Sequence, residues 1–488
     1  MGKTITIKVS PTVLTLSPRL DAKMVEVVRK ATRYRIDGFQ FTDAFKRHTW
    51  DGWTYPFKKN QTAPSGTYRR IANILKKNGY KVKIKFLNDF GPCGKLEANI
   101  HSPREDQIRI CKKLIKFRIC SGDASIRSGK TFLMSLMSNR IGHYPVCIVS
   151  KSSTVVEQTI REVGRFLDKD VGYLHAGKFK PSDVWITSYD MLRTVYAAHF
   201  DPNVRKRRSK KIRDRNTKVF KLIKKTKVLL LDECQFSFSG ITKEVLKTFT
   251  NIGYKIGFSG TPVPDSCTRK EFETVIGPLV SRVSMGELIE KGILAKPKIL
   301  MYDLPESWYL KYLIEYKEAV VENIVNNTNR NRFIAYVVEE LAKRNKTSYI
   351  MVSRIEHGKI LRRMIRGSFF VHGQTKSDTR EQVYKSLMNG KLKCIISTVG
   401  KFGLNLPNLD AVINAEGMRS KSQTKQKMRS LTAAAGKKFG LVIDFVDHGY
   451  ILERHSEVRL DIYNNLKGFI VKVKPVPENV FTRRRSHG

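Results

Sequence analysis

The chain has 488 residues, which is enough for about three domains of ~150 residues each. Its 91 Lys and Arg outnumber 44 Asp and Glu, so the formal net charge is +47, far more than an enzyme for small neutral substrates needs. Such a charge repels itself and is tolerated best on a polyanion, so we expect nucleic acid as the partner, with an anionic membrane surface as the rival.

Two further features of the composition narrow the class of protein. An apolar fraction of 41% supports packed cores. Seven cysteines without a C-x-x-C pair predict reduced, mostly buried thiols rather than a disulfide framework or a metal ribbon. The sequence has no apolar run of membrane-spanning length and no signal-peptide segment, so we expect a cytoplasmic protein without a membrane partner.

Residues 1–95 predict a small α+β module in which aromatic residues are mixed with basic ones, as in "TWDGWTYPF" and "GTYRRIANILKKNGYKVKIKF". Trp50 and Phe57 either stack on bases or belong to the core, and both interpretations stay open. The basic residues of the module are candidate phosphate contacts. They are Lys46, Arg47, Lys58, Lys59, Arg69 and Arg70.

The stretch "ASIRSGKT", residues 124–131, predicts a phosphate-binding loop in front of a helix. In such loops backbone N–H groups point at the phosphates, the Lys reaches the β/γ-phosphates and the Thr hydroxyl holds Mg²⁺. The residues that fit this pattern are Ser128, Gly129, Lys130 and Thr131. Ala124 replaces the first glycine. For Arg127, either the loop tolerates the side chain or its guanidinium adds a phosphate contact.

Short apolar, β-rich runs alternate with helical patterns along the rest of the chain, which predicts parallel sheets covered on both faces. The runs form two sets, at 145–150, 184–188, 227–233 and 255–260, and at 348–353, 368–373, 393–399, 411–415 and 440–445. The stretch 295–325 between the sets reads as a linker. We therefore expect two tandem α/β domains at 96–295 and 296–465, followed by a basic tail at 466–488.

A basic segment lies between Arg205 and Lys227, where thirteen Lys or Arg stand against one acid. It is either a solvated, mobile insertion or a loop that tracks a second strand of the substrate and loses affinity steeply with salt. Arg207 and Lys210 are its candidate nucleic-acid contacts.

The run that follows this segment ends in "VLLLDECQ" and carries two adjacent carboxylates. An apolar strand with such an ending exposes both at the carboxyl edge of the sheet, where ligands bind. Asp232 would hold Mg²⁺ through its water shell, and Glu233 would accept the proton of the attacking water. The alternative is a solvated pair at a strand end.

The phosphate loop, D-E-C-Q and "SGTP" (259–262), in this order, resemble the superfamily 2 helicases, and further matches cover most of residues 100–445. The resemblance implies two RecA-like motor domains that bind ATP between them and use its hydrolysis to move along a strand.

The resemblance also implies roles for individual residues. "SPREDQIRI" is similar to an adenine-reading element, with Arg104 and Gln107 as candidates. Gln235 stands in the usual place of a histidine in the catalytic group. Beside the cleft, Gly403 fits the pattern and Asn405 replaces the common aspartate. The positions expected to contact the nucleic-acid strand are Lys151, Ser188 and Thr398.

An arginine of the second motor domain should reach the γ-phosphate and stabilise the charge of the transition state. Counted back from Gly436 in "QTKQKMRSLTAAAGKK", Arg429 takes this position. Met428 occupies the place of a glycine and Thr432 that of a second arginine. A neighbouring register puts Ser430 at the position and leaves the site without an arginine.

The stretch around "WDGWTYPF" is similar to the N-terminal domain of phage UvsW-like helicases, which remodel branched DNA. It implies an ATP- and Mg²⁺-dependent DNA helicase or translocase that acts on forks and junctions. We expect a monomer, in the host cytoplasm if the gene is a phage gene, with Trp50 and its basic neighbours on the DNA. The alternatives are a superfamily 2 RNA helicase and a non-catalytic DNA-binding protein with a decayed motor.

Overall fold

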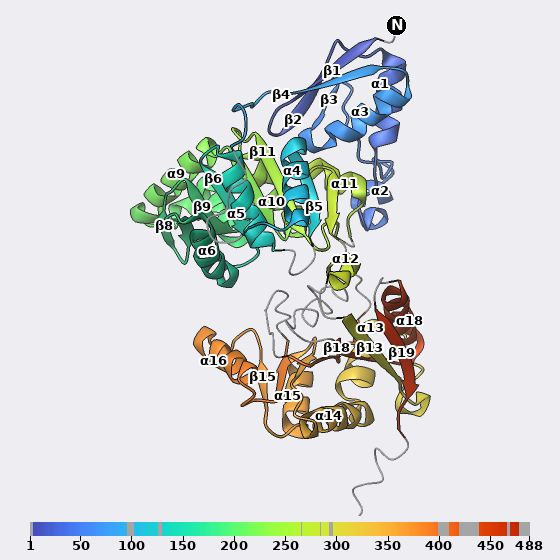
Figure 1. The fold of residues 1–488 in the computed structure, drawn as a ribbon. Helices are drawn as coiled ribbons and strands as arrows, with labels where there is room; N and C mark the ends of the chain where they lie inside the picture. Colours follow the sequence, from blue (N-terminus) through green and yellow to red (C-terminus); the bar gives the residue numbers. More distant parts are fainter. Residues whose placement is uncertain are drawn as a thin grey trace, which may run out of the picture. The chain divides into compact units, whose positions relative to one another are not determined.

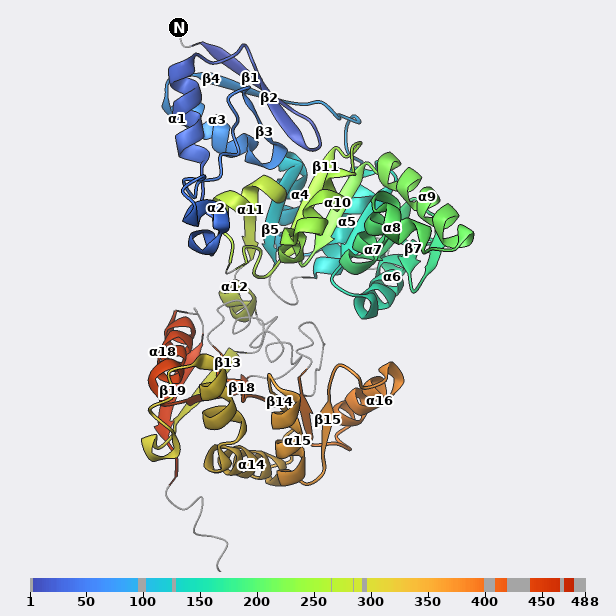
Figure 2. The same ribbon diagram turned by 180° about the vertical axis from the view of Figure 1, so that it is seen from behind.

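The computed structural model describes residues 3–94, 102–124, 129–264, 266–283, 285–291, 296–398, 409–418, 439–465 and 469–477. The chain divides into two compact units, Met1–Val283 and Ser284–Gly488. Figures 1 and 2 show the ribbon from opposite sides. Among the described residues, none forms a helix that is long and apolar enough to cross a bilayer.

The first unit begins with a four-stranded sheet in the order β3-β2-β1-β4. Its strands are β1 (Thr4–Val9), β2 (Val13–Ser17), β3 (Thr62–Pro64) and β4 (Lys81–Phe86). Inward side chains alternate with outward ones along β1, since one face of the sheet packs on helices α1 (Ala22–Thr32) and α3 (Tyr68–Lys77). The segment between α1 and β3 contains the short helices η1 (Phe39–Phe41) and α2 (Asp43–Lys46). The predicted α+β module is present.

The rest of the first unit is built on an eight-stranded sheet in the order β12-β5-β11-β10-β6-β9-β7-β8. Its strands are β5 (Ile119–Ala124), β6 (Val146–Ser150), β7 (Gly172–His175), β8 (Lys178–Lys180), β9 (Val184–Ser188), β10 (Val228–Asp232), β11 (Tyr254–Ser259) and β12 (Leu279–Val283). Only the β7–β8 pair is antiparallel among the described strands of this sheet. The central strands are fully buried, as expected for a parallel sheet covered on both faces.

Helices cover both faces of this sheet. They are α4 (Glu105–Phe117), α5 (Lys130–Ile141), α6 (Ser153–Leu167), α7 (Tyr189–Phe200), α8 (Pro202–Lys206), α9 (Lys210–Lys225), α10 (Gly240–Lys247) and α11 (Arg269–Val275). Side chains of α7, α9, α10 and α11 form one apolar cluster with β6, β9 and β10. Figures 1 and 2 show α5 and α6 on the opposite face from α7 and α8.

The N-terminal module is bonded to the sheet that follows it. Arg70 Nε and Nη2 donate to the Glu273 carboxylate at 2.6 and 2.9 Å. The Tyr68 hydroxyl donates to the Phe117 carbonyl at 2.7 Å. Gly66 is required at the contact, because a Cβ there would lie 2.0 Å from the Glu273 carbonyl oxygen. Arg70, which the sequence suggested as a phosphate contact, thus forms an ion pair with Glu273 instead.

The second unit is built on a seven-stranded sheet in the order β15-β16-β14-β17-β18-β13-β19. Its strands are β13 (Lys296–Asp303), β14 (Ser348–Met351), β15 (Ser368–Val371), β16 (Cys394–Ser397), β17 (Ala411–Asn414), β18 (Phe439–Val446) and β19 (Ile470–Pro475), and all their described pairings are parallel. The longer helices are α14 (Thr328–Lys343), α15 (Ile355–Met364), α16 (Ser377–Met388) and α18 (Tyr450–Asn464). Shorter helices are α12 (Met285–Glu290) and α13 (Tyr316–Val320).

Two sequence assignments in this unit need correction. The stretch 295–325 is not only a linker, because β13 pairs with β18 along its whole length. The region 466–488 is not only a tail, because β19 pairs with β13 from Ile470 to Pro475. Both strands were missed because their lysines interrupt the apolar pattern; β19 is an edge strand, where exposed charge is common.

Buried ion pairs connect helices and a strand of the second unit. Arg330 is fully buried, and its Nε donates to Asp447 at 2.7 Å. Arg459, equally buried, donates through Nε to Asp444 at 3.1 Å. Both acids lie in or just after β18, so these pairs fix α14 and α18 against the end of that strand. Breaking a buried pair by removing one partner typically costs about 3–5 kcal/mol, and Asp447 would keep a contact to Arg459 Nη2 at 3.5 Å if Arg330 were removed.

Candidate nucleotide and nucleic-acid sites

Three charged side chains converge at the carboxyl edge of the first parallel sheet. Lys130 opens α5, which follows β5, while Asp232 ends β10 and Glu233 comes directly after it. The Lys130 Nζ donates to Glu233 Oε1 and lies 3.6 Å from Asp232 Oδ1. The three side chains are only 15–21% exposed. The phosphate-loop lysine and the D-E pair therefore share one site.

Glu233 is held by several neighbours. Its Oε2 accepts hydrogen bonds from Gln235 Nε2 at 2.8 Å and from Ser259 Oγ at 3.2 Å. The backbone N–H of Thr261 donates to the same Ser259 hydroxyl oxygen at 2.9 Å. The D-E-C-Q and S-G-T-P stretches thus meet at one carboxylate, whose own backbone adopts a left-handed φ of 49°.

Asp232 is suited to a cation. Its Oδ1 is buried and has no hydrogen-bond partner among the described residues. Burial raises the pKa of Asp232, and the Lys130 ammonium opposes that rise. A carboxylate oxygen that lacks donors is a typical ligand of Mg²⁺ or of the water around it. Thr131, half-buried in the first turn of α5, supplies the hydroxyl expected beside it. The residues present therefore fit a magnesium ion.

Lys151, expected on the nucleic-acid strand, lies near these carboxylates. Strand β6 pairs in register with β10, with Val149 opposite Leu231, so the residues that follow both strands reach the same edge. The Lys151 Nζ is 4.9 Å from the centre of the Phe236 ring. Burial lowers the pKa of Lys151, and the Glu233 charge opposes this effect. Because this proximity depends on the pairing of β6 with β10, the local sequence did not predict it.

The adenine-reading candidates lie on or beside α4. Gln107 is buried, and its Oε1 accepts from the Arg104 backbone N–H at 3.1 Å. Gly129 has a φ of 78°, and a Cβ there would lie 2.7 Å from Gln107 Nε2. The backbone angle therefore favours glycine at this position, and the Gln107 amide packs directly against it. The Arg104 guanidinium donates to both Asp106 oxygens at 3.1 Å.

Other predicted nucleotide residues lie outside the described part of the chain. They are Ser128, Gly403, Asn405 and Arg429, together with Arg127, Met428, Ser430 and Thr432.

The N-terminal aromatic residues divide between core and surface. Phe57 is fully buried and belongs to the core. Trp50 is half-buried, and its indole N–H donates to the Trp53 carbonyl at 2.8 Å. The sequence pattern did not single out Trp53, whose ring lies 4.2 and 4.5 Å from the guanidinium carbons of Arg33 and Arg35. These contacts keep two cations at an aromatic surface.

The remaining strand-contact candidates differ in exposure. Lys58 is exposed, whereas Arg69 lies 4.6 Å over the Phe117 ring. Ser188 is buried, and its hydroxyl accepts from the Met191 N–H at 3.2 Å to cap α7. Thr398, in the second unit, is half-buried just after β16. Ser188 thus has a structural function that the sequence did not predict.

The basic segment 205–227 is not a loop. It contains the last two residues of α8 and all of α9, and α9 buries Asn216, Val219, Phe220 and Ile223 against the sheet. These positions recur at helical spacing, which is the pattern that could have predicted the helix. The opposite face of α9 is exposed and basic. It carries Lys210, Lys211, Arg213, Lys218, Lys221, Lys224 and Lys225. We call these seven residues the α9 basic face; Arg207, just after α8, is also exposed.

Comparison with known proteins finds a matching helicase family model and related helicases. Residues 330–429 match the family model "Helicase conserved C-terminal domain". The chain is 24% identical over 241 residues to the ATP-dependent DNA helicase uvsW of Enterobacteria phage T4, covering 48% of each chain. It is 23% identical over 274 residues, 55% of this chain and 40% of the other, to the putative DNA 3'-5' helicase Rad25 of Haloarcula marismortui. The matches span about half or less of these relatives.

A solved structure shows the fold. Dbp5 of S. cerevisiae, bound to RNA and ADP BeF3, has a TM-score of 0.52 to this chain, at 14% identity, over 77% of this chain and 90% of its own. The two parallel sheets are therefore those of tandem RecA-like domains. Together with the domain match and the curated relatives, they confirm that this chain resembles the superfamily 2 helicases of the UvsW type.

Proposed function

We propose that this protein is an ATP-dependent DNA helicase or translocase that remodels forks and junctions by moving along a strand. The observation that carries the proposal is the meeting of Lys130, Asp232 and Glu233 at one sheet edge. Further support comes from the net charge of +47 and from the α9 basic face, which suit a polyanionic substrate.

The described residues suggest how ATP would be used. The N-terminus of α5, with Gly129 before it, offers backbone N–H groups to the phosphates. Lys130 would shift from Glu233 to the phosphate oxygens, because a triphosphate carries more negative charge than one carboxylate. Glu233, held by Gln235 and Ser259, would then accept the proton of the attacking water. Asp232 and Thr131 would hold Mg²⁺, which neutralises charge on the phosphates when bound.

The proposal extends to the second unit through Arg429, assigned as the residue that stabilises the transition state. Arg429→Ala should lower ATP turnover by about 10³-fold if this register is right. Ser430→Ala is the matched control, because it tests the neighbouring register. A normal rate for Arg429→Ala would remove the assignment.

The test of the function is ATP turnover and strand separation with a forked DNA, a plain duplex and a single-stranded RNA. We expect the forked DNA to stimulate turnover most and to be unwound. Lys130→Ala should abolish turnover while DNA binding remains, since the lysine lies beside Asp232 and Glu233, where the nucleotide is proposed to bind, and is not a proposed contact to the nucleic acid. Stronger stimulation by RNA would favour an RNA helicase, and DNA binding without turnover would indicate a decayed motor. Sedimentation with and without DNA tests the expected monomer.

A further inference from the structure

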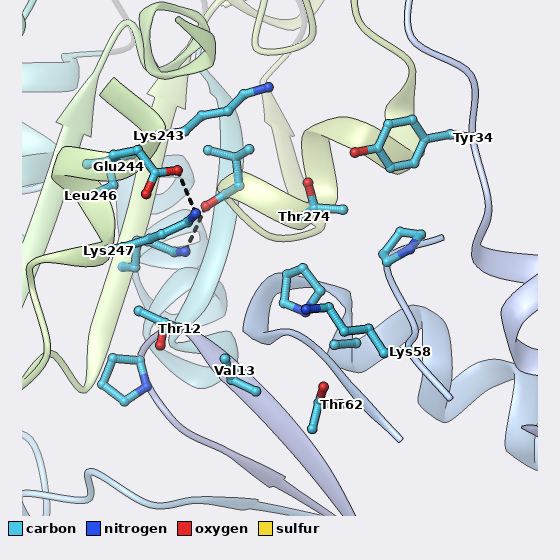
Figure 3. A pocket seen from close by; sticks show the side chains of 16 residues that line it. Thr12, Val13, Tyr34, Lys58, Thr62, Lys243, Glu244, Leu246, Lys247 and Thr274 are labelled. Carbon is cyan, nitrogen blue, oxygen red and sulfur yellow. Dashed lines mark hydrogen bonds and ion pairs between the residues drawn. The ribbon is translucent and has the colours of Figure 1, made fainter. Parts of the chain in front are cut away.

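A cavity of about 510 Å³ lies within the first unit, between the N-terminal module and the parallel sheet. Figure 3 shows its walls: Thr12, Val13 and Thr62 come from the edge of the small sheet, while Lys243, Lys247 and Thr274 come from α10 and α11. The volume falls within the range of small-molecule sites, which is about 300–1,000 Å³. The nucleotide site contributes none of its lining residues.

Positive charge dominates the lining. Four lysines line the cavity, against one glutamate. Lys247 is bonded to that glutamate, Glu244, at 2.6 Å, and Lys243 is bonded to Glu271 at 3.1 Å. No acid pairs with the other two lysines, Lys58 and Lys255, among the described residues. Among the described residues, each wall of the cavity therefore carries a lysine without an acidic partner, Lys58 on the module and Lys255 on the parallel sheet.

Of these two lysines, Lys255 is the stronger indication of an anion site. It is only 6% exposed, and its ammonium donates one hydrogen bond, to the Val275 carbonyl at 2.7 Å. An ammonium has three N–H donors, so two of them have no acceptor in the described part of the chain. A buried cation without a counter-ion is costly, as the lowered pKa of Lys255, about 8, also indicates. An anion in the cavity would supply the missing acceptors.

We propose that this cavity binds a phosphate group between Lys255 of the motor sheet and Lys58 of the N-terminal module. The oxygen atoms of a phosphate are strong acceptors for ammonium and hydroxyl donors, which are the groups that Lys58, Lys255 and the threonines contribute to the walls. The group belongs either to a free phosphate-bearing small molecule or to the end of a nucleic-acid strand. Its binding would join the two parts of the first unit through charge.

The test is thermal unfolding of the full-length protein in increasing inorganic phosphate at constant ionic strength. The wild type, Lys255→Met and Lys58→Met are compared with Lys77→Met, which removes an exposed lysine of α3 as a matched control. We expect phosphate to raise Tm equally in wild type and control. Lys255→Met should weaken binding about tenfold or more, as expected when a hydrogen bond to a charged group is removed.

Lys58→Met keeps the test valid if Lys255→Met does not fold, since Lys58 is exposed; we expect a clear loss of affinity there as well. Binding at the nucleotide site is common to all four proteins and cancels in the comparison. Equal Tm shifts in all four proteins would overturn the proposal.

A second measurement identifies the source of the phosphate. The dinucleotide TpT, with and without a 5′-phosphate, is titrated by calorimetry into wild type and Lys58→Met. Binding that needs both the 5′-phosphate and Lys58 assigns the cavity to a strand end. If inorganic phosphate binds and neither dinucleotide does, the cavity is assigned to a free anion. Only the assignment of the cavity to a strand end rests on the proposed function. If the protein showed no DNA-stimulated turnover, the binding of inorganic phosphate in the cavity would still stand or fall by the Tm measurement.

Discussion

Glu233 illustrates how little of a catalytic carboxylate's surroundings can be read from its own motif. The sequence predicted the residue and its role as a base, because two acids after an apolar strand are a strong signal. The hydrogen bond from Ser259 depends on a strand neighbour twenty-six residues away in the chain. Such a contact requires the pairing of β10 with β11, which a local pattern does not specify.

Gln235 should position Glu233 rather than bind the nucleotide. We expect Gln235→Ala to lower the rate constant of ATP hydrolysis by about 10-fold, less than the roughly 10²-fold or greater effect of losing the general base itself. The apparent affinity for ATP should change little, and the pH profile should shift because Glu233 loses a donor to its charged form. Gln158→Ala, which removes an exposed bond to Glu162, is the control. An unshifted pH profile with a normal rate would contradict the assignment.

Lys255 should make stability depend on pH. Burial holds its pKa at about 8, against 10.5 for an ordinary lysine. Between these values the unfolded chain binds more protons than the folded one, so stability rises with pH across this window. The charged groups that line the same cavity are Lys58, Lys243, Glu244 and Lys247, with Tyr34.

Urea unfolding at pH 7, 9 and 10.5, in buffer without phosphate, checks this effect. Lys255→Met should gain up to about 3 kcal/mol over the wild type at pH 7, and the gain should shrink toward pH 10.5. If the difference in unfolding free energy between Lys255→Met and the wild type did not change with pH, burial would not lower the pKa of Lys255.

At the scale of elements, each of the nine apolar runs predicted as strands overlaps a strand of the structure to within a few residues at each end. They were predictable because buried parallel strands are apolar on both faces. Strands β13 and β19 and helix α9 were not, because lysines within them mask the apolar positions. In α9 the buried side chains are few, and charge dominates the composition of the segment.

The α9 basic face should contribute to DNA affinity by binding phosphates. Replacing Lys218, Lys221 and Lys225 with Gln should weaken DNA binding and make its dependence on salt less steep, by about one unit of slope for each phosphate that the protein no longer neutralises. The helix should persist, since the buried side chains are unchanged. Replacing Lys343, Lys346 and Lys359 with Gln removes equal charge from the second unit as a control. Equal effects of the two sets would indicate general attraction only.

At the scale of the whole molecule, the sequence predicted an N-terminal module and two parallel sheets, and the structure contains all three. It did not predict that the module is bonded to the first parallel sheet. The residues that form this contact, Gly66, Tyr68 and Arg70, resemble an ordinary helix start. Their partners lie far away in sequence, so only the folded chain identifies them.

The Arg70–Glu273 pair should couple the stability of the module to that of the sheet. Arg70→Met should destabilise the first unit by about 1–3 kcal/mol, because Glu273 is nearly buried and its remaining ion pair among the described residues, to Arg269 at 3.6 Å, is longer. Adding Glu273→Gln should recover part of the loss, since the unpaired charge is then removed. Denaturant unfolding of the four proteins of this double-mutant cycle measures the coupling. Additive effects would show that the two side chains do not interact.

The chain between the module and the sheet is also bonded along its course. Asp89 accepts from Arg118 at 2.9 Å, and the Arg140 guanidinium donates to the Cys93 carbonyl at 3.2 Å. Several hydrogen bonds and ion pairs thus hold the module against the parallel sheet. If a nucleic-acid strand binds at the aromatic surface around Trp53, its distance from Lys130 should stay constant while the motor moves, because both residues belong to the same unit.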